Sequence, residues 1–365
     1  MYQAVDNYQR TLGASAGRSA YSSATSVARL IDQARSAVAN LVGATNPSSV
    51  AFALNGTDAL NMAIHGTLRP GDHVVTTVIE HNSILRPLSE LTERIGIQVT
   101  YVDCDDVGRV ASADIAAALQ PNTRLVAVSH ASNVTGAIQS VEEIAKAVAD
   151  HPALLLVDAA QSLGHLNVDV RCGIDLLASS GHKGLLGPLG TGILVVSDSA
   201  AETIQSSRQG GTGTSSEDDR QPNALPEKLE SGNLYVPGIV GLMAGINSVQ
   251  HQGLESLRRH EITLTELALS QLSYNESITI YGPKAASERV GVVSFNLAGH
   301  DPHELATLLD SIAGIETRSG LHCAPRMHRR LGTNQSNGCV RASFGPFSET
   351  KDVELLTSTL AKLNI

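Results

Sequence analysis

A lysine set among small residues is the side chain of this sequence best suited to covalent chemistry. Lys183 ends a Ser-Gly-His-Lys segment at 180–183, and glycines follow at positions 184, 187, 190 and 192. A lysine amine can form a Schiff base with an aldehyde. Upstream, the apolar run Ala153–Val157 has the length of a strand buried on both faces, and the carboxylate Asp158 follows it. Because open α/β sheets bind ligands at the carboxyl ends of their strands, we expect Asp158 to face a ligand.

Neither residue is specific alone, since a turn lysine is usually solvated and a strand-end aspartate is often a cap. The specificity lies in the order of three segments: Asp158-Ala-Ala-Gln161, Ser180-Gly-His182-Lys183 and Gly187-Pro188-x-Gly190-x-Gly192. This order resembles the signature of class V aminotransferases, fold-type I enzymes that use pyridoxal 5'-phosphate (PLP), and most of all their cysteine desulfurase and selenocysteine lyase branch. The resemblance implies five cofactor contacts: Lys183 to the aldehyde, Asp158 to the pyridinium, Gln161 to the ring oxygen, and Ser180 and His182 to the phosphate.

Strand and helix patterns alternate through the first part of the chain. Strand-like runs occur at 50–54, 74–79, 99–102 and 125–129, and helical patterns at 57–66, 83–95, 114–119 and 141–150. Such alternation predicts right-handed crossovers and a mainly parallel sheet covered by helices on both faces. Beyond a long loop at 207–226, helical patterns at 239–249 and 254–272 lead to a region of short strands (290–297, 316–318, 339–344) and helices (301–312, 350–363).

We therefore expect an α/β protein of two domains, a large one at 1–250 and a smaller α+β one at 251–365. With the resemblance, the expected fold is the PLP-dependent transferase fold type I. The first 50 residues are mostly helical, with one helix at about 25–41, and one option is that they pack on the small domain. Related enzymes usually carry a strand and an Asn-Ala-Ala-Thr-like segment before this point. That segment is missing here, either because the sequence is truncated or because the protein truly departs from the family. How the substrate reaches the site is therefore an open question.

Three loops after predicted strands carry further candidates. Gly56 and Thr57 start a helix, where free N–H groups and a hydroxyl can hold a phosphate. His81 follows Glu80, as in the Glu-His segment of the resembled family, in which the histidine stacks on the cofactor ring; it could also shuttle a proton. The segment Ser-His-Ala-Ser-Asn at 129–133 resembles one in which the asparagine, here Asn133, reaches the ring oxygen and the substrate.

The second region carries the residues that point to sulfur chemistry. Arg318-Ser-Gly-Leu-His-Cys323 resembles a family motif in which the cysteine accepts sulfur as a nucleophile, although Leu321 replaces a histidine of that motif. Arg341 matches an arginine that clamps the substrate carboxylate, as the bidentate geometry of guanidinium suits. We expect His322, Arg318 and Arg341 to make the local field positive, which lowers a thiol pKa from its usual value of about 8.5.

A departure from the family occurs after the long loop. Relatives carry a Glu-x-Gly-Thr-x-Asn segment whose threonine reaches the phosphate bound by the partner subunit. This chain has Asn233 at the threonine position and Tyr235 at the asparagine position. An asparagine amide can still donate a hydrogen bond to a phosphate, so the role of Asn233 stays open.

Bulk properties exclude several classes of protein. The 365 residues include 42% hydrophobic ones, with a net charge of −10 and a pI near 5.7, so neither nucleic acid nor a membrane is expected as a partner. No apolar run approaches about 20 residues, and the polar start is no signal peptide, so we expect a cytoplasmic protein. The four cysteines have neither CxxC nor Cys/His metal spacing, so no zinc site or disulfide framework is predicted.

The hypothesis that unites these residues is a PLP-dependent cysteine desulfurase. It would convert L-cysteine to L-alanine as a homodimer, with Lys183, Cys323 and His81 as catalytic residues, and would pass sulfur from Cys323 to an acceptor protein, for example in iron–sulfur cluster assembly. Asn133, Arg318 and Arg341 would bind the substrate. Three alternatives remain open: a selenocysteine lyase acting on L-selenocysteine, a class V aminotransferase, and a weakly active PLP-binding subunit that relays sulfur.

Overall fold

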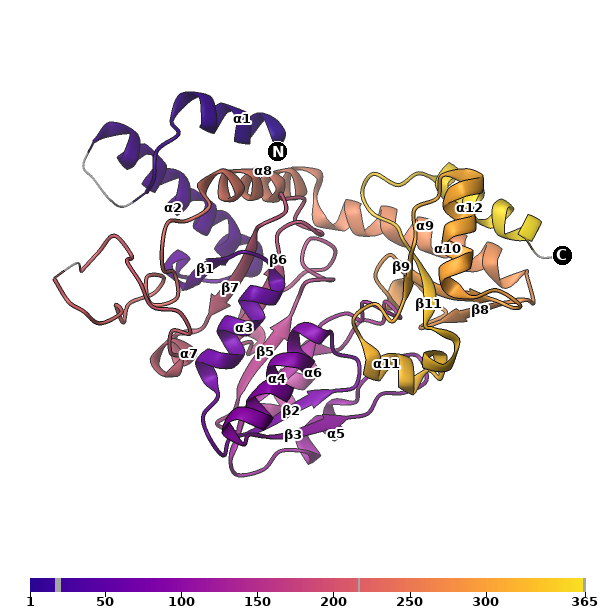
Figure 1. The fold of residues 1–365 in the computed structure, drawn as a ribbon, viewed down its shortest axis with the longest axis horizontal. Helices are drawn as coiled ribbons and strands as arrows, with labels where there is room; N and C mark the ends of the chain where they lie inside the picture. The colour runs from indigo at the N-terminus through magenta and orange to yellow at the C-terminus, as the bar shows by residue number, and fades with distance from the viewer. Residues whose placement is uncertain (17–20, 216, 364–365) are drawn as a thin grey trace.

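The computed structural model describes residues 1–16, 21–215 and 217–363. Its larger sheet has seven strands in the order β1-β7-β6-β5-β4-β2-β3 (Figure 1). Only β7 runs against its neighbours, so the sheet is mainly parallel, as predicted. The strands are β1 (Val50–Ala53), β2 (His73–Thr77), β3 (Gln98–Val102), β4 (Thr123–Ser129), β5 (Leu154–Asp158), β6 (Leu176–Ser180) and β7 (Gly192–Val196).

Side chains of this sheet alternate between two separate hydrophobic cores. In β5, Leu155 and Val157 face one core while Leu154 and Leu156 face the other. Both faces are buried, which explains the continuous apolar runs in the sequence. Helices and short 3-10 turns connect and cover the strands: α3 (Gly56–Thr67), α4 (Asn82–Ile95), α5 (Ser112–Ala117), α6 (Val141–Val148), α7 (Asp198–Thr203), η1 (Pro47–Ser49) and η2 (Val170–Cys172).

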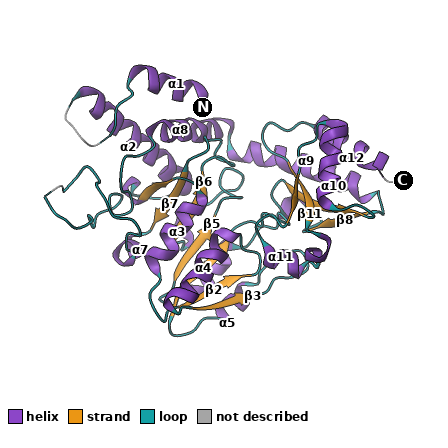
Figure 2. Cartoon of the chain, viewed as in Figure 1, coloured by secondary structure: helices purple, strands orange, loops and turns teal. Residues whose placement is uncertain are grey.

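A second sheet, entirely antiparallel, lies apart from the first (Figure 2). Its order is β10-β11-β9-β8, and apolar residues of three of its helices share a core with it. Its strands are β8 (Ile278–Tyr281), β9 (Val292–Leu297), β10 (Arg318–Gly320) and β11 (Cys339–Ser343). The helices of this part are α9 (Leu254–Ser273), α10 (Pro302–Ala313), α11 (Pro325–Arg330) and α12 (Thr350–Leu363), with short turns η3 (Ala286–Glu288) and η4 (Thr333–Ser336).

The sequence placed one strand of this sheet too early and missed another. The strand expected at 316–318 is found at Arg318–Gly320, and β8 was not expected at all. Gly320 and Ser319 are poor strand formers, so pairing with β11 and not local propensity sets β10. Strand β8 is only partly buried and pairs on one side alone, which leaves a weak apolar pattern.

The N-terminal helices α1 (Tyr2–Thr11) and α2 (Ser22–Val42) pack on α8 (Val236–Gln252) and not on the small sheet. This differs from the option that they cover the smaller domain. The hydroxyl of buried Tyr8 donates to the carbonyl of Ala14 at 2.6 Å, which fixes the turn after α1. Helix α9 follows α8 directly and reaches the second sheet (Figure 1). In the described parts of the chain, no helix is both long and apolar enough to span a membrane.

Candidate active site

A polar cavity lies at the carboxyl ends of the parallel strands of the large sheet. The structure brings together in its wall eight residues predicted from sequence: Gly56, Thr57, His81, Asn133, Asp158, Gln161, Ser180 and Lys183. Ser83, Ser129, Ala131 and Ala160 complete the lining, and sequence reasoning gave them no role.

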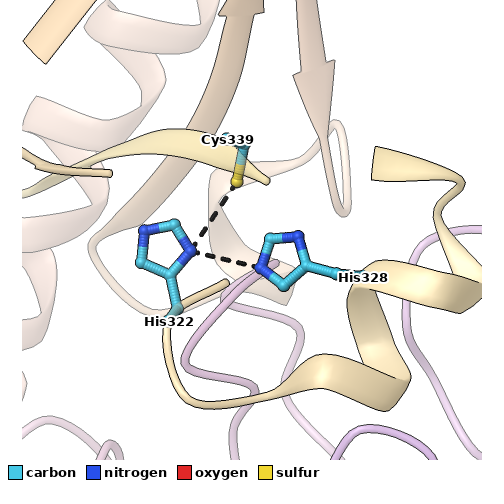
Figure 3. A group of neighbouring side chains, drawn as sticks. All are labelled: His322, His328 and Cys339. Carbon is cyan, nitrogen blue, oxygen red and sulfur yellow. Dashed lines mark hydrogen bonds between the residues drawn. The ribbon is translucent and has the colours of Figure 1, made fainter. Parts of the chain in front are cut away.

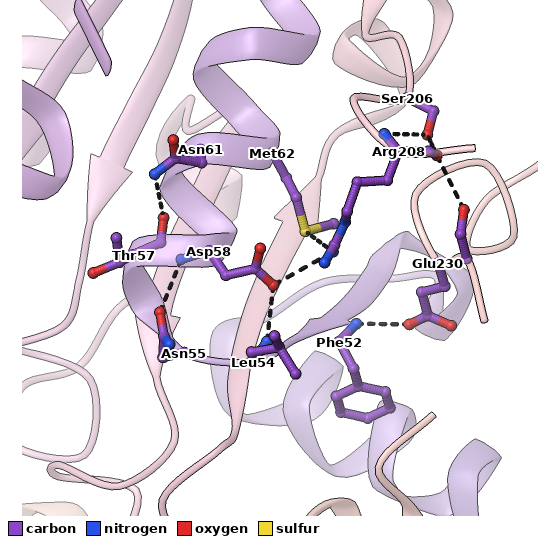
Figure 4. Close-up of polar contacts among 11 residues, drawn as sticks. Phe52, Leu54, Asn55, Thr57, Asp58, Asn61, Met62, Ser206, Arg208 and Glu230 are labelled. Atoms are coloured by element: carbon purple, nitrogen blue, oxygen red, sulfur yellow. Dashed lines mark hydrogen bonds and ion pairs between the residues drawn. The ribbon is translucent and has the colours of Figure 1, made fainter. Parts of the chain in front are cut away.

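The start of α3 forms one end of the cavity. Asn55 caps this helix by accepting a hydrogen bond from the Asp58 N–H at 2.9 Å, while the Asp58 carboxylate accepts from Leu54 (Figure 4). Gly56 lies so close to Ser180 that a Cβ at Gly56 would stand 2.5 Å from the serine hydroxyl oxygen. Glycine is therefore needed for the helix start to approach β6. The Gly56 N–H donates to the Ser180 hydroxyl at 3.2 Å, so a hydroxyl lies directly at this helix N-terminus, a position that suits a phosphate.

His81 is held in one tautomer. Its Nδ1 accepts a hydrogen bond from the Ser83 backbone N–H at 3.0 Å, and the Ser83 hydroxyl lies 2.8 Å from the same nitrogen. Burial lowers the pKa of His81 to about 4, and the positive charges of Lys183 and Arg318 act in the same direction. The neutral imidazole therefore carries its proton on Nε2. It presents an uncharged ring and one N–H donor.

Asp158 and Lys183 form the charged centre of the cavity. Asp158 ends β5, is buried, and accepts from the Ala160 N–H at 2.9 Å; burial raises its pKa, while Lys183 opposes the shift. Burial also lowers the pKa of Lys183, and Arg341 and Arg318 add to this effect, whereas Asp158 counteracts it. A lysine with a lowered pKa has more of the free amine, which is the nucleophilic form.

Glu80 is a buried acid close to this centre, and no role for it was predicted from the sequence. Its carboxyl accepts from the Thr77 hydroxyl at 2.6 Å, and from the Ser129 hydroxyl and N–H at 2.6 and 3.1 Å. Burial raises its pKa to about 7 despite these bonds, and the charge of Asp158 contributes. Its position next to His81 was the available sequence signal.

The segment that carries Cys323 is anchored by its backbone. His322 and Cys323 both have left-handed backbone angles, with φ of 49° and 59°. Their carbonyls accept hydrogen bonds from the large domain, the first from Asn133 Nδ2 at 2.7 Å and the second from the N–H of Asn82, the first residue of α4, at 2.6 Å. The Cys323 thiol is partly exposed and lies 3.2 Å from a guanidinium nitrogen of Arg318.

Arg341 lies opposite Arg318 in the β10–β11 pair. Its NH1 donates to the Asn133 carbonyl at 2.9 Å, and burial lowers its pKa to about 10. Its buried Nε has no hydrogen-bond partner within the described residues. A guanidinium with an unpaired buried N–H needs an acceptor, and a carboxylate ligand would supply it.

The expected positive role of His322 is wrong. This histidine is buried, and burial lowers its pKa to about 3, with Arg341 acting in the same direction. It is therefore neutral at physiological pH. Any positive field at Cys323 comes from the arginines.

Comparison with known proteins identifies the family. The Aminotransferase class-V family model matches residues 1–356. The chain belongs to this family. It is 38% and 34% identical to probable cysteine desulfurases of Methanothermobacter thermautotrophicus and Pyrococcus abyssi, over 99% of this chain and 90% of each of those proteins. The apo structure of a cysteine desulfurase from Thermococcus onnurineus NA1 matches with a TM-score of 0.92 at 34% identity, over 99% of this chain and 90% of that one.

These comparisons confirm the predicted family and the predicted fold class, the PLP-dependent transferase fold type I. Four predicted site residues do not line this cavity: His182, whose side chain is exposed, and Arg318, Arg341 and Cys323, which lie on or next to the small sheet. Asn233 is exposed and borders a different cavity, beside Gly190 and Arg208.

Proposed function

We propose that this protein is a cysteine desulfurase that uses PLP and L-cysteine. The observation that carries the proposal is the position of the Cys323 segment beside the cavity that holds Lys183: Asn133, which lines this cavity, donates to the His322 carbonyl, and the N–H of Asn82, next to His81, donates to the Cys323 carbonyl. The names of the relatives point to the same reaction. L-cysteine and the thiol of Cys323 are converted to L-alanine and a persulfide on Cys323, so all atoms are conserved.

The cavity fits PLP by the chemistry of its donors. The α3 N-terminus with Thr57 and Ser180 would hold the phosphate, Asp158 the pyridinium, and Gln161 and Asn133 the ring oxygen, while His81 offers a neutral ring for stacking. Lys183 provides an amine for the aldehyde. When bound, PLP supplies an electron sink for bonds at the substrate α-carbon.

The side chains of this chain then have separate tasks. Arg341 Nε is free to bind the substrate carboxylate, with Arg318 beside it. The Lys183 amine, with its lowered pKa, can accept and return a proton at the α-carbon. The Cys323 thiolate attacks the substrate sulfur; the S–S bond forms as the C–S bond breaks, and the carbon is protonated to alanine.

The same proposal covers assembly and partners. Exposed Asn233, away from the Lys183 cavity, would reach the phosphate of a second copy in a homodimer. A partly exposed Cys323 would pass its sulfur to an acceptor protein, as iron–sulfur cluster assembly requires. L-selenocysteine could occupy the same site.

The test is the Cys323→Ala variant. It should keep the visible spectrum of bound PLP and its change on adding L-cysteine, yet lose sulfide release and any protein-bound persulfide. Cys172→Ala is the matched control, because this partly buried thiol lies outside the cavity, and it should behave as the parent. Sulfide release from Cys323→Ala at the parental rate, or a keto acid product in place of alanine, would refute the desulfurase and favour an aminotransferase.

A further inference from the structure

Three buried side chains on and beside the small sheet point their ligand atoms at one another. They are His322, after β10; His328, in α11; and Cys339, at the start of β11 (Figure 3). Nδ1 of His322 lies 3.3 Å from Nε2 of His328 and 3.8 Å from the sulfur of Cys339. All three ligand atoms lie within 4.8 Å of one another. Their spacing in sequence follows no common metal motif, so no metal site could be predicted from the sequence.

These separations fit the coordination shell of a tetrahedral cation. Zinc bonds of about 2.0–2.1 Å to nitrogen and about 2.3 Å to sulfur place two nitrogens about 3.3 Å apart, and a nitrogen and a sulfur about 3.6 Å apart. The His322–His328 distance agrees with the first value, and the His322–Cys339 distance is close to the second. The third pair, Nε2 of His328 and the sulfur of Cys339, lies within 4.8 Å, so a shared cation would draw these two atoms together by up to about 1.2 Å.

The outer ring nitrogens are held as in known metal sites. Nε2 of His322 lies 3.2 Å from the Arg318 carbonyl, which can only accept, so this nitrogen carries the proton and Nδ1 is a lone pair. Nδ1 of His328 lies 2.7 Å from the Thr333 hydroxyl, which itself donates to the His328 carbonyl at 3.3 Å. With a cation on Nε2, Nδ1 would carry the proton and donate to this hydroxyl; without a cation, Nε2 can donate to Nδ1 of His322 across 3.3 Å. Such hydrogen bonds orient ligating histidines.

We propose that His322, His328 and Cys339 bind one zinc ion. Two imidazoles and a thiolate form a ligand set that suits zinc, and a water can be the fourth ligand. The Cys339 thiol loses its proton to solvent as the metal binds. The ion would join β10, α11 and β11 around His322 and Cys323, both of which have left-handed backbone angles, and so fix the segment that carries the proposed nucleophile.

The test measures metal and not turnover, so it is independent of the proposed desulfurase activity. Holoenzyme stripped with a chelator is titrated with Zn²⁺ against a chromophoric competitor, and its ligands are read by X-ray absorption at the zinc edge. We expect one zinc per chain with two nitrogens and one sulfur. Cys339→Ser should weaken binding at least tenfold and remove the sulfur signal.

Cys323→Ser is the decisive control, because its thiol adjoins His322 and is the alternative sulfur ligand. This variant should bind zinc as the parent does, and so should Cys104→Ser, which alters another buried thiol. If Cys339→Ser does not fold, His328→Gln takes its place, since glutamine can keep a hydrogen bond to Thr333. Less than one zinc per chain, a sulfur signal lost in Cys323→Ser, or unchanged binding in the Cys339 or His328 variant would overturn the proposal.

Discussion

Replacing Glu80 by glutamine should stabilise the protein, and increasingly so as the pH rises. The Glu80 side chain is fully buried, and its pKa is raised from 4.5 to about 7, mainly by burial. A glutamine can keep the observed contacts, because its oxygen can accept from Thr77 and the Ser129 N–H while its amide donates to the Ser129 hydroxyl. It reproduces the protonated acid without the possibility of ionising.

The sign and size of the effect of Glu80→Gln on the free energy of unfolding follow from proton linkage. Between pH 4.5 and 7 the folded protein holds a proton on Glu80 that the unfolded chain has lost, so the free energy of unfolding falls as the pH rises through this window. The rise of the pKa from 4.5 to about 7 corresponds to about 3 kcal/mol. At about 2.1 cal/mol/K of unfolding entropy per residue, this is about 4 °C for a chain of 365 residues.

Thermal unfolding of parent and Glu80→Gln should therefore be compared from pH 4.5 to 8.5. The difference in Tm should be near zero at the acid end and grow to about 4 °C in favour of the variant above pH 7. Glu93→Gln, at an exposed helical position, should show no such trend. A pH-independent difference, or a variant that loses stability as the pH rises, would contradict the burial argument.

The remaining predictions concern the cofactor and the core. Lys183→Ala should abolish borohydride-stable attachment of PLP to the chain, and a reduced pyridoxyl peptide at another lysine would count against the assignment. Asp158→Asn should fold and bind PLP but turn over about tenfold more slowly, since a neutral hydrogen bond is about half as strong as a charge-assisted one; parental turnover would argue against pyridinium pairing. Glu230→Gln should cost about 3 kcal/mol or more in thermal unfolding, because it leaves buried Arg35 without its 2.5 Å carboxylate partner, whereas exposed Glu202→Gln should not.

The large sheet was predictable because its strands are buried on both faces. Runs such as Leu154–Val157 are continuous, and each is followed by polar residues at the ligand-binding edge. Parallel strands end at a common edge, so the order of strands was enough to bring Asp158 and His81 to one cavity. The motif around Lys183 then predicted that this lysine lies in the same cavity as Asp158 and His81.

Contacts that depend on the small sheet could not be predicted from the sequence. The zinc-type cluster joins positions 322, 328 and 339, and its geometry depends on β10–β11 pairing and on α11, which were misplaced or missed. The neutrality of His322 has the same origin, because burial follows from packing between elements and not from the neighbouring residues. The residue types therefore indicated which atoms could bind or react, but not whether these side chains are buried or which groups surround them.

The anchoring of Cys323 shows how the fold can present a thiol without enclosing it. Both hydrogen bonds from the large domain go to backbone carbonyls, of His322 and Cys323, and not to the sulfur. The left-handed conformation of the two residues turns these carbonyls toward the large sheet, while the sulfur contacts only the Arg318 guanidinium within the described hydrogen bonds. A backbone held in this way restricts the position of the thiol but leaves its lone pairs accessible. A sulfur atom that must first attack a substrate and then meet an acceptor needs this combination.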